Sequence, residues 1–320
     1  RNMTTAITIG MTIIYVAIMM GIGVYTARQT RSVSDFVLGS HSVGSWLTAF
    51  AYGTSYFSAV VFIGYAGQFG WTYGVSAAWV GVGNALLGSL LAWIVLGRRT
   101  RIMTQSLGAK TMPEYFEKRW NSKGLKIAAA LIVFVFLIPY TASVYNGLSR
   151  LFNMAFQIES EGAYKIIIIV MALLTAIYVI LGGYAATAIN DFIQGIVMLI
   201  GIAAVVICAI QNQGGLTSAL AALGEIEVNG KTNTLNSVFG PDPLNLLGVV
   251  ILTSLGTWGL PQMIHKFYAI KSENDIKKGA VISTVFALIV AGGSYLLGGF
   301  DRLFCTLTED GSGKTVISTL

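Results

Sequence analysis

Long apolar runs, separated by short polar segments, recur along the whole chain. Each run has about the 20 residues that a helix needs to cross the hydrocarbon core of a bilayer, and the runs are continuous rather than alternating, which is typical of helices. A tight turn at Gly182-Gly183 separates two of them. We therefore expect about eight spans, at residues 3–27, 44–71, 75–97, 126–155, 164–182, 185–211, 244–268 and 276–300.

The composition is that of a chain that lies mostly in lipid. Hydrophobic residues make up 55% of the 320 residues and charged residues 11%, with a mean hydropathy of +0.72. A soluble domain has about 25% charged residues. The net charge of +6 comes from basic residues in short loops, which indicates membrane orientation and not nucleic-acid binding. The expected partner is the lipid bilayer, and no nucleic acid is expected.

The basic residues concentrate on one side of the predicted membrane. The loops that join spans 1 and 2, 3 and 4, and 7 and 8 hold, with adjacent helix ends, 14 of the 20 basic residues: Arg28, Arg31, Arg98, Arg99, Arg101, Lys110, Lys118, Arg119, Lys123, Lys126, Lys266, Lys271, Lys277 and Lys278. Positively charged loops stay in the cytoplasm. We therefore expect a multi-pass protein of the cell (plasma) membrane with both chain ends, including the N-terminus, outside.

Three segments outside the spans have their own patterns. Thr111-Met112-Pro113-Glu114 predicts the start of a short amphipathic helix on the inner membrane surface, because it combines a capping box with an early proline. Residues 212–243 predict a wet and partly irregular outer loop. Residues 315–320 look like the beginning of another helix, so we expect the chain to be an N-terminal fragment.

One motif suggests nucleotide binding but does not meet its requirements. Residues 311–315 read Gly-Ser-Gly-Lys-Thr, as in part of a phosphate-binding loop. Thr308 stands where that loop needs its first glycine, and we expect no strand before the segment. No nucleotide site is therefore predicted. The two cysteines, Cys208 and Cys305, show no metal-ligand spacing.

Two spans have polar and helix-breaking residues near their centres. The second contains the polar stretch 54–58, and the seventh contains Gly256, Gly259 and Pro261 within 253–261. Free backbone groups in a bilayer are tolerated only where they are buried in protein or line a wet cavity, and paired broken helices are typical of transporter binding sites. The alternative is that the small residues allow close helix packing. The matching positions, five spans apart, favour the break.

Two further residues within spans carry candidate chemistry. Asp191 lies just inside the cytoplasmic end of the sixth span, where an acid is costly and usually functional. It could also interact with the dipole at a helix N-terminus, and both interpretations can hold. Tyr140 gives the fourth span a polar face. Interhelical hydrogen bonding and solute binding remain open for this tyrosine.

Motifs in order along the chain resemble the sodium/solute symporter family, especially its pantothenate and proline branches. The match extends over essentially all 320 residues. The motifs are Asp35-Phe36-Val37-Leu38-Gly39 before the second span, Ser58-Ala59 with Phe62-Ile63-Gly64, Gly182-Gly183 with Asn190-Asp191 and Gln194-Gly195, and Gly259-Leu260-Pro261 in the seventh span.

The resemblance implies an all-α integral membrane protein with a five-plus-five inverted-repeat transporter fold. One extra helix precedes the first repeat, and the second repeat is incomplete in this chain. Residues 1–320 are expected to form a single transmembrane domain. In the family, the next helix supplies hydroxyl residues to the principal sodium site, so this chain alone is not expected to complete that site.

The resemblance also implies roles for individual residues. The backbone carbonyls of Thr54 and Phe57 match sodium ligands, and Asp191 matches an aspartate associated with sodium binding or release. No metal other than sodium is expected. Tyr140 matches a tyrosine near the substrate of the proline branch. The full set of expected solute-binding residues is Ser55, Tyr56, Ser58, Tyr140, Ser143, Thr253, Thr257 and Trp258.

Departures from the family pattern bear on the solute. The proline branch has an aspartate where this chain has Tyr56 and aromatic residues where it has Thr253 and Thr257. The sugar-transporting branch has a glutamine in place of Val61. These departures disfavour proline and sugar and favour pantothenate or another small carboxylate.

The resulting hypothesis is a symporter that imports a small organic solute by alternating access. The sodium ion is the expected coupling ion, and a proton is the nearest alternative. A solute sensor or receptor built on the symporter fold is the alternative function, because some family members are fused to kinases. An enzyme is not expected, since the chain has no catalytic cluster of His and Cys. The sequence does not indicate an oligomeric state.

Overall fold

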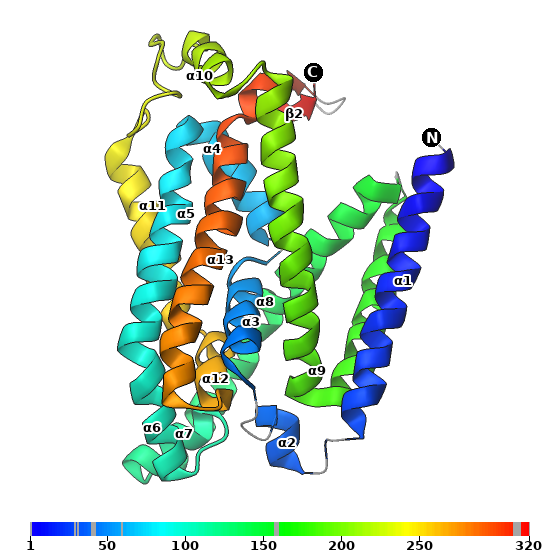
Figure 1. Cartoon of the computed structure of the whole chain (residues 1–320), viewed down its shortest axis with the longest axis vertical. Coiled ribbons are helices and arrows are strands. Elements are labelled where there is room, and N and C mark those ends of the chain that lie inside the picture. Colours follow the sequence, from blue (N-terminus) through cyan, green and yellow to red (C-terminus); the bar gives the residue numbers. More distant parts are fainter. Residues whose placement is uncertain are drawn as a thin grey trace. The chain divides into compact units, whose positions relative to one another are not determined.

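A computed structural model describes residues 2–28, 30, 32–39, 43–58, 60–156, 160–309 and 315–319. Arg31, Ala59, Leu320 and residues 311–314, named above, lie outside the described residues. Helices dominate the structure (Figure 1). The chain divides into two compact units, the first made of Arg1–Val60, Leu91–Gly195 and Trp258–Ser283 and the second of Val61–Leu90, Ile196–Thr257 and Thr284–Leu320.

The first unit contains the N-terminal helix, several short helix segments and the long helix of the predicted fourth span. Its elements are α1 (Asn2–Ala27), α2 (Val33–Leu38), α3 (Ser45–Tyr56), a π-helical turn (Trp93–Gly97), α6 (Arg98–Leu107), α7 (Met112–Trp120), α8 (Lys123–Phe156), the first part of α9 (Glu161–Asn212), α12 (Pro261–Ala269) and the start of α13 (Glu273–Gly299).

The second unit contains further helix segments and a hairpin. Its elements are π-helical Val61–Tyr65, α4 (Ala66–Tyr73), a 3-10 turn (Gly74–Ala77), α5 (Ala78–Gly83), π-helical Asn84–Leu90, the rest of α9, α10 (Leu216–Glu225), α11 (Pro243–Leu255), the rest of α13, a 3-10 turn (Asp301–Leu303), β1 (Cys305–Glu309) and β2 (Thr315–Thr319). A further 3-10 turn, Gly256–Gly259, crosses the boundary between the units.

Helices long and apolar enough to cross a membrane number five in the described part of the chain. They are Ala6–Ala27, Ala66–Leu107, Lys123–Asn153, Gly162–Asn212 and Glu273–Leu303, and Pro243–Gly259 with Pro261–Ala269 form a sixth candidate bent by 54°. The number differs from eight because the second predicted span is divided near residue 57 and because α9 joins two predicted spans. The set of eight spans and the single domain remain predictions.

The predicted turn at Gly182-Gly183 is confirmed. Gly183 takes φ 58° and ψ −149°, which interrupts the helical conformation within the 52 residues of α9. Side chains are strongly disfavoured in this backbone region. A Cβ atom at Gly183 would also lie 2.6 Å from the carbonyl oxygen of Phe36, so the turn packs directly against α2.

The loop at the start of α7 confirms the predicted helix start. The Thr111 hydroxyl accepts a hydrogen bond from the Glu114 amide (3.4 Å), whereas the Glu114 carboxylate accepts one from the Lys110 amide (2.8 Å) and not from the Thr111 amide of a full capping box.

The segment 212–243 is partly irregular, as predicted. It contains the short helix α10, which packs Leu223 in a buried cluster with Leu235, and the residues after α10 form turns and irregular structure.

The prediction of a helix at 315–320 is wrong. Thr315–Thr319 pairs as an antiparallel strand with Cys305–Glu309, in keeping with the β-branched side chains of β2. A strand therefore does precede residues 311–314, contrary to expectation. The element after them is a second strand and not the helix that a phosphate-binding loop requires.

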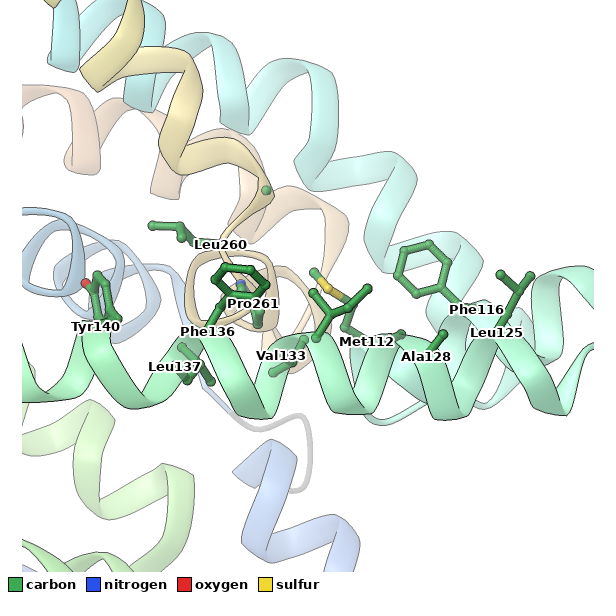
Figure 2. A pocket seen from close by; sticks show the side chains of 13 residues that line it. Met112, Phe116, Leu125, Ala128, Val133, Phe136, Leu137, Tyr140, Leu260 and Pro261 are labelled. Atoms are coloured by element: carbon green, nitrogen blue, oxygen red, sulfur yellow. The ribbon is translucent and has the colours of Figure 1, made fainter.

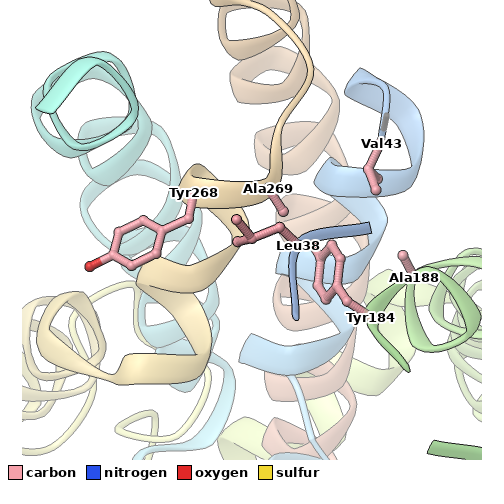
Figure 3. Packing of buried hydrophobic residues seen from close by; sticks show 6 residues of the cluster. All are labelled: Leu38, Val43, Tyr184, Ala188, Tyr268 and Ala269. Carbon is pink, nitrogen blue, oxygen red and sulfur yellow. The ribbon is translucent and has the colours of Figure 1, made fainter. Parts of the chain in front are cut away.

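A buried apolar cluster in the first unit packs the segment from α2 to the start of α3 against α9 and α12. It consists of Leu38, Val43, Tyr184, Ala188, Tyr268 and Ala269, with the Leu38 side chain beside the Tyr184 ring (Figure 3). The Lys271 amide donates to the Val43 carbonyl (3.0 Å), which joins the entry of α3 to the segment after α12. The cluster holds α3, α9 and α12 in place within this unit.

Candidate functional site

The second span is broken immediately after its polar stretch. The Phe57 amide donates to the Gly53 carbonyl (2.9 Å), and the chain then leaves the helix at Phe57 with φ −100° and ψ 73°. The last carbonyls of a helix have no partner within it. The carbonyl groups at the end of α3, including that of Thr54, are therefore available to a ligand.

The seventh span is also broken. Helix α11 ends at Leu255, a 3-10 turn follows, and Leu260 is extended with φ −69° and ψ 126° before α12 begins at Pro261. The two helical parts are bent by 54°. Pro261 lacks an amide donor, which explains why the helix cannot continue through it. Both predicted breaks are confirmed, and continuous helices packed through small residues are excluded.

Helix α3 of the second span and helix α12 of the seventh pack together through aromatic side chains. The ring of Tyr52 on α3 lies 5.7 Å from that of Phe267 on α12, measured between centroids, and 5.5 Å from that of Trp93. Trp93 meets Phe267 edge-on at 5.1 Å. All three side chains are almost fully buried. Rigid aromatic packing of this kind fixes the position of α3 relative to α12.

Tyr140 lies beside the break in the seventh span. It lines a cavity of about 430 Å³ with Gly259, Leu260 and Pro261, and Figure 2 shows its ring on α8 at one end of this group. The rest of the lining is apolar and comes mostly from α8, with Met112 and Phe116 from α7. The structure thus brings Tyr140 and the break together, as a binding role requires, although the cavity itself is mainly apolar.

Asp191 interacts with a buried lysine, Lys266, which the sequence pattern assigned to the cytoplasmic side of the membrane. The aspartate is half-buried on α9 and interacts electrostatically with Lys266 on α12. Lys266, counted above among the cytoplasmic basic residues, is only 7% exposed, and its ammonium group lies 5.1 Å from the centroid of the Tyr184 ring. Its position five residues after Pro261, inside the predicted span 244–268, was the signal that could have shown this burial.

Thr253 and Thr257 belong to the second unit, where their hydroxyl groups are hydrogen-bonded. The Thr253 hydroxyl donates to the side-chain oxygen of Asn84 (3.0 Å) and to the Val249 carbonyl (2.8 Å). The Thr257 hydroxyl donates to the Ser254 carbonyl (3.0 Å). Sequence reasoning missed Asn84, a buried amide in the apolar third span, which also accepts a hydrogen bond from the Ser254 hydroxyl (3.1 Å).

The remaining candidates are four residues at the two breaks and Ser143 on α8. Tyr56 and Phe57 are buried with ring centroids 4.5 Å apart, and Ser55 and Ser58 are half-buried beside them. Trp258 is half-buried in the 3-10 turn of the seventh span. Ser143 is exposed on α8 and donates its hydroxyl to the Tyr140 carbonyl (2.7 Å). A binding role for each remains a prediction.

Comparison with known families decides the membership of this chain. The sequence profile of the sodium:solute symporter family matches residues 36–318. The chain belongs to the sodium:solute symporter family. Membership confirms the resemblance to this family that the ordered motifs indicated.

Individual relatives of this symporter-family chain are named for sodium-coupled transport. A sodium/proline symporter of Staphylococcus aureus (strain JH9) is 34% identical over 271 residues, which cover 83% of this chain and 50% of that relative. Those of strains Mu3 / ATCC 700698 and COL match equally. The chain therefore spans about half the length of the curated relatives it matches.

A solved structure confirms the fold class. A Na⁺-coupled sialic acid symporter in a substrate-bound outward-open state matches with a TM-score of 0.67 and 18% identity, over 90% of this chain and 58% of that one. The expected all-α, five-plus-five inverted-repeat membrane fold is thereby shown, with a multi-pass arrangement. At this identity the likeness shows the fold alone.

Proposed function

We propose that this chain is part of a sodium-coupled symporter that imports a small organic carboxylate by alternating access. The two broken spans are the observation that carries the proposal, because each exposes helix ends where a cation or a charged solute can be held. In this proposal the carbonyls of Thr54 and Phe57 and the carboxylate of Asp191 serve sodium. The hydroxyl-bearing residues at the breaks and Tyr140 serve the solute.

A carboxylate fits the break in the seventh span. Helix α12 begins there at Pro261, and the N-terminus of a half-helix favours an anionic group. Proline and sialic acid, the solutes named for the relatives, both carry a carboxylate. Pantothenate does so too, and the threonines at 253 and 257 keep it among the candidates beside these two.

The proposed orientation in the membrane rests on the distribution of basic residues among the loops. Of the 14 basic residues assigned to the inner side the structure describes 13, and with Lys266 buried 12 of these remain in loops or at helix ends. This bias still supports a plasma-membrane protein with its N-terminus outside.

The test is uptake into proteoliposomes that contain the full-length protein. Radiolabelled proline, pantothenate and sialic acid are supplied separately under an inward sodium gradient, an inward proton gradient or neither. We expect accumulation of one carboxylate under the sodium gradient and none without it. Accumulation driven by the proton gradient alone would replace sodium by a proton as the coupling ion. Binding without accumulation under any gradient would contradict transport and favour a sensor.

A further inference from the structure

A cluster of polar side chains lies between α9 and α12 in the first unit. Lys266 is buried with its ammonium group over the ring of Tyr184. The ring of His265 meets the same tyrosine edge-on, with centroids 4.9 Å apart and planes at 74°. Asp191, two turns after Tyr184 on α9, interacts electrostatically with both Tyr184 and Lys266. The proposed function uses only Asp191 from this group.

The contacts of Lys266 are unusual for a buried cation. A buried ammonium group is costly unless it is paired or hydrogen-bonded. Among the described residues, no carboxylate lies within the 4.0 Å ion-pair distance of Lys266, and Asp191 is the acid that attracts it. The aromatic ring offsets part of the burial by a cation–π interaction. The ammonium group of Lys266 therefore contacts the Tyr184 ring, while Asp191 attracts it from beyond ion-pair distance.

Two further polar side chains can bind either sodium or the ammonium group of Lys266. The Tyr184 hydroxyl and both polar atoms of the Gln262 amide are buried and have no hydrogen-bond partner among the described residues. Gln262 precedes Lys266 by one turn of α12, so the two share a face of that helix. Buried polar groups are normally hydrogen-bonded. Oxygen atoms of this kind suit both sodium and an ammonium group.

We propose that Lys266 is a tethered cation that competes with sodium for Asp191. When sodium is absent, the ammonium group moves from the Tyr184 ring and neutralises the carboxylate. When sodium occupies the carboxylate, the ammonium group returns to the ring. The flexible four-carbon stem of lysine permits this movement without a change in the backbone. Because both cations neutralise the same charge, each weakens the binding of the other. The inference rests on the proposed function, which assigns Asp191 to sodium.

The first experiment tests the charge pair without requiring transport. The full-length protein and its variants Lys266→Met, Asp191→Asn and the double variant are melted in sodium-free detergent solution. We expect Lys266→Met to lower Tm in the parent protein by at least about 2 °C more than it lowers Tm in the Asp191→Asn background. In the parent, the substitution leaves the charge of Asp191 without a partner, whereas in the Asp191→Asn background that charge is already absent. Strictly additive changes in Tm would mean that the two charges do not interact, and would overturn the pairing of Lys266 with Asp191. Lys278→Met, at an exposed position on α13, is the control and leaves Tm unchanged.

The second experiment measures binding of radiolabelled sodium by the same purified proteins. Lys266→Met is expected to bind sodium about fivefold or more tightly than the parent, whereas Lys266→Arg, which keeps the charge, does not. The Tm of each variant, measured in the first experiment, shows whether a loss of binding reflects misfolding. Intact binding with unchanged affinity in Lys266→Met overturns the competition alone. Absence of sodium binding in the parent overturns the competition and the proposed function together.

Discussion

The side-chain oxygen of Asn84 lies 3.0 Å from the hydroxyl oxygen of Thr253, although the two residues are 169 positions apart. The same oxygen accepts a hydrogen bond from Ser254 (3.1 Å). Asn84 lies in a π-helical stretch and the two hydroxyl residues in α11, so one amide joins two apolar helices of the second unit. Hydrogen bonds between membrane helices are worth about 0.6 kcal/mol on average and up to about 1.7 kcal/mol.

Removing this acceptor is expected to loosen the outer part of the seventh span. Asn84→Leu leaves two hydroxyls without their shared partner, so we expect a loss of about 1–2 kcal/mol of stability. The measurement is the decrease in Tm of the purified variant relative to the parent protein. Asn84→Gln, which keeps an amide oxygen as acceptor, is expected to lower Tm less than Asn84→Leu. An equal fall in both variants would mean that Asn84 acts through packing alone.

The turn at Gly183 is expected to tolerate no side chain. Gly183→Ala places a Cβ in a disfavoured backbone region and 2.6 Å from the Phe36 carbonyl oxygen, so we expect a cost of about 1–3 kcal/mol and reduced abundance. Gly201→Ala in the same helix is the matched control, because nothing lies within 4 Å of its Cβ. Equal abundance of the two variants in membranes, measured by immunoblot, would contradict this prediction.

Asp191 is expected to govern sodium dependence rather than folding. Asp191→Asn removes the charge that would attract sodium, so the sodium concentration for half-maximal uptake should rise about tenfold or more while membrane abundance stays near that of the parent. Glu225→Gln, at an exposed position on α10, should change neither quantity. A parallel loss of abundance and uptake would instead support a purely structural role.

Thr257 is expected to affect the solute and not sodium. Its hydroxyl makes one local bond to the Ser254 carbonyl, so Thr257→Val should fold normally. If the break lines the solute site, the KM for the solute should change several-fold at saturating sodium. Thr217→Val on α10 serves as the control at an exposed position. Unchanged KM in Thr257→Val would remove this residue from the site.

The orientation can be tested with the two cysteines, both of which are free. We expect a membrane-impermeant maleimide to label Cys305, in the outer hairpin, on intact cells. In a variant that lacks both natural cysteines, Lys123→Cys at the start of α8 should react only after permeabilisation. Labelling with the opposite sidedness would invert the topology.

Much of the fold was predictable because its causes are local. Pro261 interrupts the seventh span whatever surrounds it, the polar stretch 54–58 marks the break in the second span, and Thr111 begins α7 through a contact within four residues. Residues 315–319 were predicted wrongly because a short apolar run suits a helix or a strand equally until its partner is known. Pairing with β1 decides that segment.

The amino-acid sequence by itself determined that this chain lies in a membrane, where its helices break and to which family it belongs. Hydrophobic length, backbone donors and turn residues are properties of neighbouring positions. Only the tertiary structure decided that Lys266 lies over Tyr184 and that Asn84 joins Thr253. Such contacts connect distant segments, and burial within lipid makes each polar side chain depend on whichever partner the packing brings to it.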